Sequence, residues 1–218
     1  MAKVGVVLSG SGVFDGAEIH EATLTLLFLD KAGAEIICMA PNVDQMHVVD
    51  HIKGEATGER RNVLVESSRI ARGAIKDMKD VKAGDLDALI FPGGFGAAKN
   101  LCDFAVKGVD CTVNPAVEKL IKEMHAAKKP LGFACIAPVI AAKVLGSFGP
   151  RLTIGNDKST AEAIDKMGGK HVDAPVDGAV VCQKNKIAST PAYMLGPTIS
   201  NVALGMEKLV NEVLKLVG

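Results

Sequence analysis

The chain has 218 residues, of which 48% are hydrophobic and 4% aromatic. This length and an aliphatic composition favour a single α/β domain over residues 1–218, with a mostly parallel sheet covered by helices on both faces. Basic and acidic residues balance at 25 each, so no net charge attracts nucleic acid or an anionic membrane, and we expect a small molecule or another protein as the partner.

The cysteines also limit the classes of protein to consider. They are five in number and contain no CxxC pair, which argues against a disulfide framework or a zinc ribbon and favours a reducing compartment. The chain begins Met1-Ala2-Lys3 and enters a strand at once. It shows no signal or transit pattern and no apolar run long enough to span a bilayer. We therefore expect a cytoplasmic protein.

The first elements alternate strand and helix. Val4–Leu8 is a β-branched run typical of a buried strand. The glycine-rich turn Ser9–Gly12 lacks the spacing of the dinucleotide and phosphate-loop fingerprints, so it predicts a tight crossing rather than a nucleotide site. Asp15–Glu18 has the D-x-x-E spacing of a capping box and predicts a helix as far as Lys31. Glu35–Ala40 reads as the second strand.

Residues 42–61 form a polar stretch longer than an ordinary strand-to-helix connection. Such a segment is a candidate lid over a site. His47 and His51 lie four residues apart with acidic residues nearby, a weak metal-ligand pattern. Histidines of a solvated loop explain the same spacing, and we expect no metal here.

The third strand, Asp87–Phe91, ends in the sequence Pro92-Gly93-Gly94-Phe95-Gly96. Successive glycines at the carboxyl end of a strand can aim backbone amides at one point and bind an anion, although a plain turn has the same composition. Further periodicity predicts helices over 62–72, 97–101, 114–125, 159–167 and 197–217, and a hairpin of 179–182 with 186–189.

A short apolar strand beginning at Lys129 ends at Cys135, and the residues from Ile136 to Leu145 read as a helix. A cysteine on such a turn is exposed at the carboxyl end of a sheet, next to backbone amides that favour a negative sulfur. The other interpretation is that Cys135 is a small buried apolar residue. Position alone leaves both open.

Three separated stretches resemble the class I glutamine amidotransferase-like superfamily, which includes the PfpI proteases and the parkinsonism-associated deglycase. They are Asp15–Glu18, Phe91–Gly94 and Gly132–Pro138. Nearly the whole chain is similar to the ElbB branch, described as an isoprenoid-biosynthesis-associated protein and as a glyoxalase. The resemblance implies a flavodoxin-like three-layer sandwich and a homodimer.

The resemblance also implies site residues. It implies a nucleophile elbow at Cys135, an acidic partner at Glu18 and an oxyanion hole from the Gly93-Gly94 turn, through the Gly94 amide, together with the amide of Ile136. Many members of the superfamily have a histidine shortly after the nucleophile. Here none occurs before His171, in a predicted surface turn. A protease or amidase, which must protonate a leaving amine, is therefore disfavoured.

The predicted activity is a glyoxalase that needs no metal or organic cofactor. In it the Cys135 thiolate adds to a carbonyl of glyoxal or methylglyoxal, and Glu18 or His20 moves a proton between the two carbons. His20 lies about 200° round the helix from Glu18 and can face away. Tyr193 is either a donor at the site mouth or a core tyrosine. The alternative function is a redox-sensing or metabolite-binding protein linked to isoprenoid biosynthesis.

Overall fold

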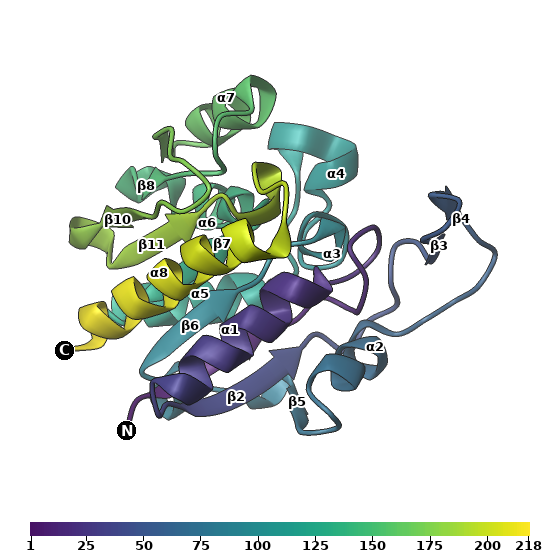
Figure 1. Cartoon of the computed structure of the whole chain (residues 1–218), viewed down its shortest axis with the longest axis horizontal. Coiled ribbons are helices and arrows are strands. Elements are labelled where there is room, and N and C mark those ends of the chain that lie inside the picture. The colour runs from purple at the N-terminus through teal and green to yellow at the C-terminus, as the bar shows by residue number, and fades with distance from the viewer.

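The computed structural model describes residues 1–218 and is built on a seven-stranded sheet with the strand order β10-β11-β7-β6-β1-β2-β5 (Figure 1). The strands of this sheet are β1 (Lys3–Val7), β2 (Glu35–Ala40), β5 (Ile75–Asp77), β6 (Ala88–Phe91), β7 (Leu131–Ala134), β10 (Val180–Cys182) and β11 (Ile187–Thr190). Two small pairs lie outside it: β3 (Val49–Asp50) with β4 (Glu55–Ala56), and β8 (Arg151–Leu152) with β9 (Lys170–His171).

The helices are α1 (Ile19–Lys31), α2 (Val63–Ile70), α3 (Phe95–Lys99), α4 (Phe104–Lys107), α5 (Pro115–Ala126), α6 (Pro138–Leu145), α7 (Lys158–Lys166) and α8 (Ile199–Val217). In Figure 1, α1 and α8 run side by side in front of the sheet, while α5 and α6 lie behind it. No helix has both the length and the apolar composition that crossing a membrane requires.

Two apolar cores fill the spaces between sheet and helices. One contains residues of α5 and α6, and the other contains residues of α1 and α8. Because side chains alternate along a strand, Ile90 enters one core while Phe91 enters the other, where it stacks on Phe133 at 4.9 Å between ring centres. The three-layer α/β sandwich expected from the sequence is confirmed.

Every strand pair of the main sheet is parallel except the β10–β11 hairpin. The long apolar strands and the hairpin were predictable because their side chains are buried on both faces. The edge strand β5 was missed, since it is short and carries Lys76 and Asp77. His171 is also corrected: it lies in β9 rather than in a surface turn, and its side chain is only 5% exposed.

Three helix starts differ from the capping prediction. The N-cap of α1 is Glu18 itself, whose Oε2 accepts a hydrogen bond from the Glu21 amide at 2.7 Å. Asp15 instead accepts from the amide of Val49 at 2.7 Å. Helix α6 begins at Pro138 rather than at Ile136, and the helix predicted over 159–167 begins at Lys158 with Asp157 as its cap. A helix start depends on which side chain reaches the free amides, and several neighbouring residues can do so.

The stretch 42–61 projects from the sandwich as the small β3–β4 hairpin at the right of Figure 1. It packs on the loop before α1, and Met46 donates its amide to Asn100 Oδ1 at 2.9 Å. None of its residues lines the cavity beside Cys135, which gives the lid prediction no support. The ring of His51 is engaged by the Phe14 amide and the Val49 carbonyl, and no group of three metal-binding side chains exists.

Gly96 allows α3 to cross directly over the loop before α1. A Cβ atom added there would lie 2.5 Å from the Ser9 carbonyl oxygen and 2.5 Å from the Gly16 carbonyl carbon. We expect Gly96→Ala to lower the free energy of unfolding by about 1–3 kcal/mol in urea denaturation, because the backbone must shift. Gly84→Ala is the control, since nothing lies within 4 Å of its added Cβ. Equal effects of the two changes would contradict this explanation.

Candidate active site

The candidate site is formed where the loops after β1, β6, β7 and β11 meet at the carboxyl ends of these strands. Cys135 follows β7 directly and has a φ of 57°, a left-handed backbone conformation that is strained for a residue with a side chain. Its amide donates to the carbonyl of Thr190 at 3.0 Å. The turn therefore has the strand-to-helix geometry of a nucleophile elbow.

The backbone amides of Gly94 and Ile136 face the Cys135 sulfur and act to lower the pKa of its thiol. Gly93 must lack a side chain here, because an added Cβ would lie 2.3 Å from the Cβ of Cys135 and 3.0 Å from its sulfur. The glycine turn after β6 thus brings the backbone close to the sulfur. The two amides point to the place where negative charge on sulfur, or on an oxygen of a bound group, is stabilised.

The carboxylate that contacts Cys135 belongs to Glu21 and not to Glu18. Glu21 is completely buried and lies beside the sulfur, since a Cβ added at Gly93 would be 2.7 Å from Glu21 Oε2 and 3.0 Å from Cys135 Sγ. Its Oε2 accepts from the Gly93 amide at 2.8 Å and its Oε1 from the Tyr193 amide at 3.1 Å. These contacts hold the carboxylate in one position against the sulfur.

The two groups strongly affect each other's protonation. Burial, assisted by the charge of Glu18, raises the pKa of Glu21 to about 7, although the Tyr193 and Gly93 amides oppose this shift. Burial and then the charge of Glu21 raise the pKa of the Cys135 thiol well above its ordinary value, against the amides of Gly94 and Ile136. Near neutral pH the thiol therefore keeps its proton, while the carboxyl of Glu21 is close to its own pKa and can accept one.

Glu18, His20 and Tyr193 lie together at the rim. Glu18 lines the same cavity as Cys135, with one oxygen used in capping and the other, Oε1, 4.0 Å from His20 Nδ1. His20 Nδ1 is 2.7 Å from the Tyr193 hydroxyl. The structure therefore brings all three predicted residues near the site, but none of them takes the place of Glu21 against the sulfur.

A signal for Glu21 was present in the sequence. It is three residues after Glu18 and lies on the buried stripe of α1 that also contains Leu24, Thr25 and Leu29. A carboxylate on an otherwise buried helix face is costly to desolvate, which marks it as functional or paired. The D-x-x-E pattern instead directed the prediction to the residue that caps the helix.

The cavity at Cys135 has a volume of about 360 Å³ and is mainly apolar. Its lining residues are Val13, Glu18, Gly94, Phe95, Ala98, Phe104, Ala105, Cys135, Ile136, Thr160, Tyr193 and Met194. No histidine lines it. The first histidine after Cys135 in the sequence is His171. Its Nε2 accepts a hydrogen bond from the Ile154 amide at 3.3 Å. The site therefore contains a thiol, a buried carboxyl and two free amides in an apolar cavity, without an imidazole.

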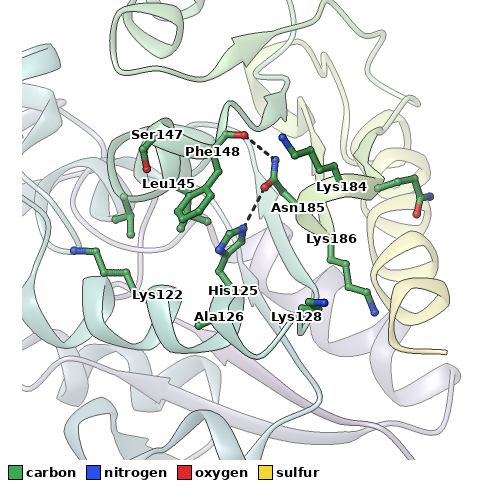
Figure 2. Close-up of a pocket in the computed structure, with 12 residues that line it drawn as sticks. Lys122, His125, Ala126, Lys128, Leu145, Ser147, Phe148, Lys184, Asn185 and Lys186 are labelled. Carbon is green, nitrogen blue, oxygen red and sulfur yellow. Dashed lines mark hydrogen bonds between the residues drawn. The ribbon is translucent and has the colours of Figure 1, made fainter.

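A larger cavity of about 790 Å³ lies near the amino ends of β7 and β11, the opposite end of these strands from Cys135. Figure 2 shows His125 held by Asn185 Oδ1 at 3.2 Å, and Asn185 in turn bonded to the Phe148 carbonyl. Four lysines line this cavity (Lys122, Lys128, Lys184 and Lys186). It holds no cysteine and is separate from the candidate active site.

The rim hydrogen bond between Tyr193 and His20 can be tested without disturbing the buried pair. Tyr193→Phe removes the hydroxyl but keeps the backbone amide that bonds Glu21. We expect the rate of any Cys135-dependent reaction to fall by no more than about tenfold, since one exposed hydrogen bond contributes about 1 kcal/mol. Steady-state kinetics measures this. A loss as large as that from removing Glu21 would place Tyr193 in the chemistry instead.

Comparison with known proteins identifies relatives over the full chain. No family model matches. The chain is 51% identical to human glutamine amidotransferase-like class 1 domain-containing protein 3, mitochondrial, covering 100% of this chain and 84% of that protein. It is 50% identical to the rat ES1 protein homolog, mitochondrial, with 100% and 85% coverage. These names contradict the expected cytoplasmic location, because both relatives are described as mitochondrial.

Solved structures agree on the fold. A crystal structure from Ehrlichia chaffeensis, described as an isoprenoid biosynthesis protein with an amidotransferase-like domain, is 39% identical and superposes with a TM-score of 0.93 over 100% of both chains. A DJ-1 superfamily protein from Salmonella typhimurium, at 24% identity and a TM-score of 0.57 over 99% of this chain and 91% of that one, shares the fold alone. Because the human relative is 51% identical over the whole of this chain, the chain belongs to the glutamine amidotransferase-like class 1 family, together with the ES1 protein homologues.

Proposed function

We propose that the protein is a cofactor-independent glyoxalase of the ElbB type, which converts small dicarbonyls such as glyoxal into hydroxy acids. The observation that carries this proposal is the contact between Cys135 and the buried Glu21, whose pKa is raised to about 7. A general base is most effective when its pKa lies near the working pH. The absence of histidine from the cavity favours a substrate without a leaving amine over an amide.

In the first step, the Cys135 sulfur attacks one aldehyde carbon while Glu21 accepts the thiol proton. The C–S bond forms as the carbonyl π electrons move to oxygen. We assign the amides of Gly94 and Ile136, which already act to lower the pKa of the thiol, to hold this oxyanion. Glu21 needs no movement, because its two backbone bonds already fix it beside the sulfur.

In the second step, a hydrogen moves from the carbon that is bonded to the Cys135 sulfur to the neighbouring carbon. We assign its removal to Glu18, whose carboxylate lines the cavity, and the delivery of a proton to the second carbon to protonated Glu21. Glu18 then gives its proton to the oxygen of that second carbon, which becomes the hydroxyl group. The product is a thioester of Cys135. Water then cleaves the C–S bond to release glycolate and regenerate the thiol. Glyoxal plus water thus gives glycolate and one proton, with no external oxidant or reductant.

The test is to incubate the purified protein with glyoxal and follow glycolate by proton NMR. The proposal predicts glycolate in an enzyme-dependent, saturable reaction. In D2O, exchange at the intermediate predicts deuterium on the carbon of glycolate that accepts the proton. Glycolate formation no faster than in buffer, at substrate concentrations up to the millimolar range, would overturn the proposal.

A second candidate function is that of a redox-sensing or metabolite-binding protein in which Cys135 does not turn over. Its metabolite-binding form is favoured by the raised pKa of the Cys135 thiol, which keeps the sulfur protonated and less reactive in the free protein. The description of the Ehrlichia chaffeensis structure as an isoprenoid biosynthesis protein fits a role in that metabolism. Mass spectrometry after mild peroxide distinguishes the candidates: selective oxidation of Cys135 in a protein without dicarbonyl turnover supports this second function.

A further inference from the structure

Two buried cysteines outside the candidate active site lie against each other. Cys102 follows α3, and Cys111 follows the short turn after α4. An antiparallel bridge between Cys102 and Val113, and a hydrogen bond from the Asp103 amide to the Thr112 carbonyl at 3.2 Å, hold the two segments together. Each thiol is the main cause of the other's pKa shift, so the two side chains lie close together. Cys102 and Cys111 are therefore a pair in space, although eight residues separate them in the chain.

The two sulfurs differ in their surroundings. Cys102 lies inward, with its sulfur 3.3 Å from the Ala97 carbonyl oxygen. Cys111 lines a small surface cavity of about 160 Å³ together with Lys143 and Glu118. The Cys102 thiol and the charge of Lys143 lower the pKa of Cys111 to about 7, although burial and the charge of Asp103 oppose this shift. Cys111 is thus the sulfur that is better suited to react as a thiolate.

The position of the pair connects it to the candidate active site. The segment between the two cysteines contains α4, and Phe104 and Ala105 of this helix line the cavity at Cys135. A covalent bond between Cys102 and Cys111 would tie both ends of this segment together. A disulfide would therefore constrain a segment that forms one wall of the cavity at Cys135.

We propose that Cys102 and Cys111 are a reversible redox pair that closes to a disulfide in the presence of a hydroperoxide. The Cys111 thiolate attacks the peroxide, so that an S–O bond forms and the O–O bond breaks, giving a sulfenic acid. The Cys102 sulfur then attacks the Cys111 sulfur, the S–S bond forms, and the S–O bond breaks with loss of water. The two sulfurs together lose two electrons, which reduce hydrogen peroxide to two molecules of water. A dithiol reverses the process.

The experiment is peptide mapping of the full chain after treatment with stoichiometric hydrogen peroxide, with free thiols blocked before trypsin digestion. Cleavage after Lys99, Lys107 and Lys119 places the two cysteines on separate peptides, 100–107 and 108–119, while Cys135 remains on a third. We expect these two peptides to be joined before Cys38 is modified, and to separate with dithiothreitol. Thiols at Cys102 and Cys111 that stay free, or oxidise separately to sulfinic acids, would overturn the proposal.

Variants give a second, independent readout. In Cys102→Ser the sulfenic acid at Cys111 has no partner, so labelling by dimedone should increase at least tenfold over the parent protein. Cys182→Ser is the matched control, because it removes another buried cysteine far from the pair in sequence and should leave the joined peptides unchanged. No increase in dimedone labelling of Cys111 in a folded Cys102→Ser protein would contradict the proposed order of the two steps.

Discussion

Replacing Cys135 with alanine is expected to reduce glycolate formation from glyoxal by at least about 10⁴-fold, to the rate in buffer. The sulfur forms the bond to the substrate, and no other nucleophile lines the cavity next to the amides of Gly94 and Ile136. The variant should fold, because alanine keeps the Cβ atom at the left-handed turn and the backbone bond to Thr190. Proton NMR of glycolate measures the rate.

Cys38→Ala is the matched control for this change. Cys38 is also a free, buried cysteine, but it lies in β2 and outside the cavity. Its removal should leave the rate of the folded protein within about twofold of the parent, even if it lowers the melting temperature. A Cys135→Ala protein that still forms glycolate at the parental rate would show that the thiol has no catalytic role.

Replacing Glu21 with glutamine is expected to lower kcat by about 10²- to 10⁴-fold, which is the usual contribution of a general acid or base. The same change should lower the pKa of the Cys135 thiol, because the charge of Glu21 is a main cause of its rise after burial. The rate of Cys135 alkylation by iodoacetamide as a function of pH measures that pKa. A more easily ionised but less active thiol would identify Glu21 as the proton acceptor.

Glu18→Gln separates the two carboxylates. Glu18 caps α1 and lines the cavity, so the proposed mechanism predicts a loss of turnover but little change in the pH dependence of Cys135 alkylation. If Glu18→Gln shifted the alkylation profile while Glu21→Gln left it unchanged, the assignment of Glu21 as the partner of the sulfur would be wrong.

The raised pKa of Glu21 also predicts how stability depends on pH. Below the ordinary pKa of 4.5, the carboxyl is protonated in both folded and unfolded states and causes no difference. As the pH rises to about 7, the unfolded chain loses this proton first, so folding is increasingly disfavoured by an amount on the order of 3 kcal/mol. The free energy of unfolding of the Glu21→Gln variant, relative to that of the parent protein, should therefore increase between pH 4 and pH 8. Urea denaturation at both pH values measures this, and a constant difference would contradict it.

Part of the site was predictable because it depends on local chain geometry. The run before Cys135 is a buried strand and the run after it a helix, so the cysteine had to lie on the turn between them. The glycine turn after β6 was likewise visible in the sequence, and Gly94 does contribute an amide to the sulfur. These features depend on neighbours in the chain, which hydrophobic patterning describes well.

The choice between Glu18 and Glu21 depended on tertiary contacts. Glu18 is the N-cap of α1 and Glu21 lies in its first turn. At a helix start, a carboxylate can either accept from the free amides or point toward the sheet. Only the positions of Gly93 and Tyr193, contributed by the loops after β6 and β11, decide that Glu21 is the carboxylate beside the sulfur. The D-x-x-E spacing is satisfied by capping alone and carries no information about those loops.

The amino-acid sequence by itself therefore determined the layered α/β architecture and the elbow at Cys135, because both follow from the local order of apolar, glycine and polar residues. Only the tertiary structure decided which acid faces the sulfur, that His171 is held in β9 beside Ile154, and that the segments of Cys102 and Cys111 pair with each other. These facts depend on segments far apart in the chain. Their packing sets burial, and burial sets the pKa values on which the proposed chemistry depends.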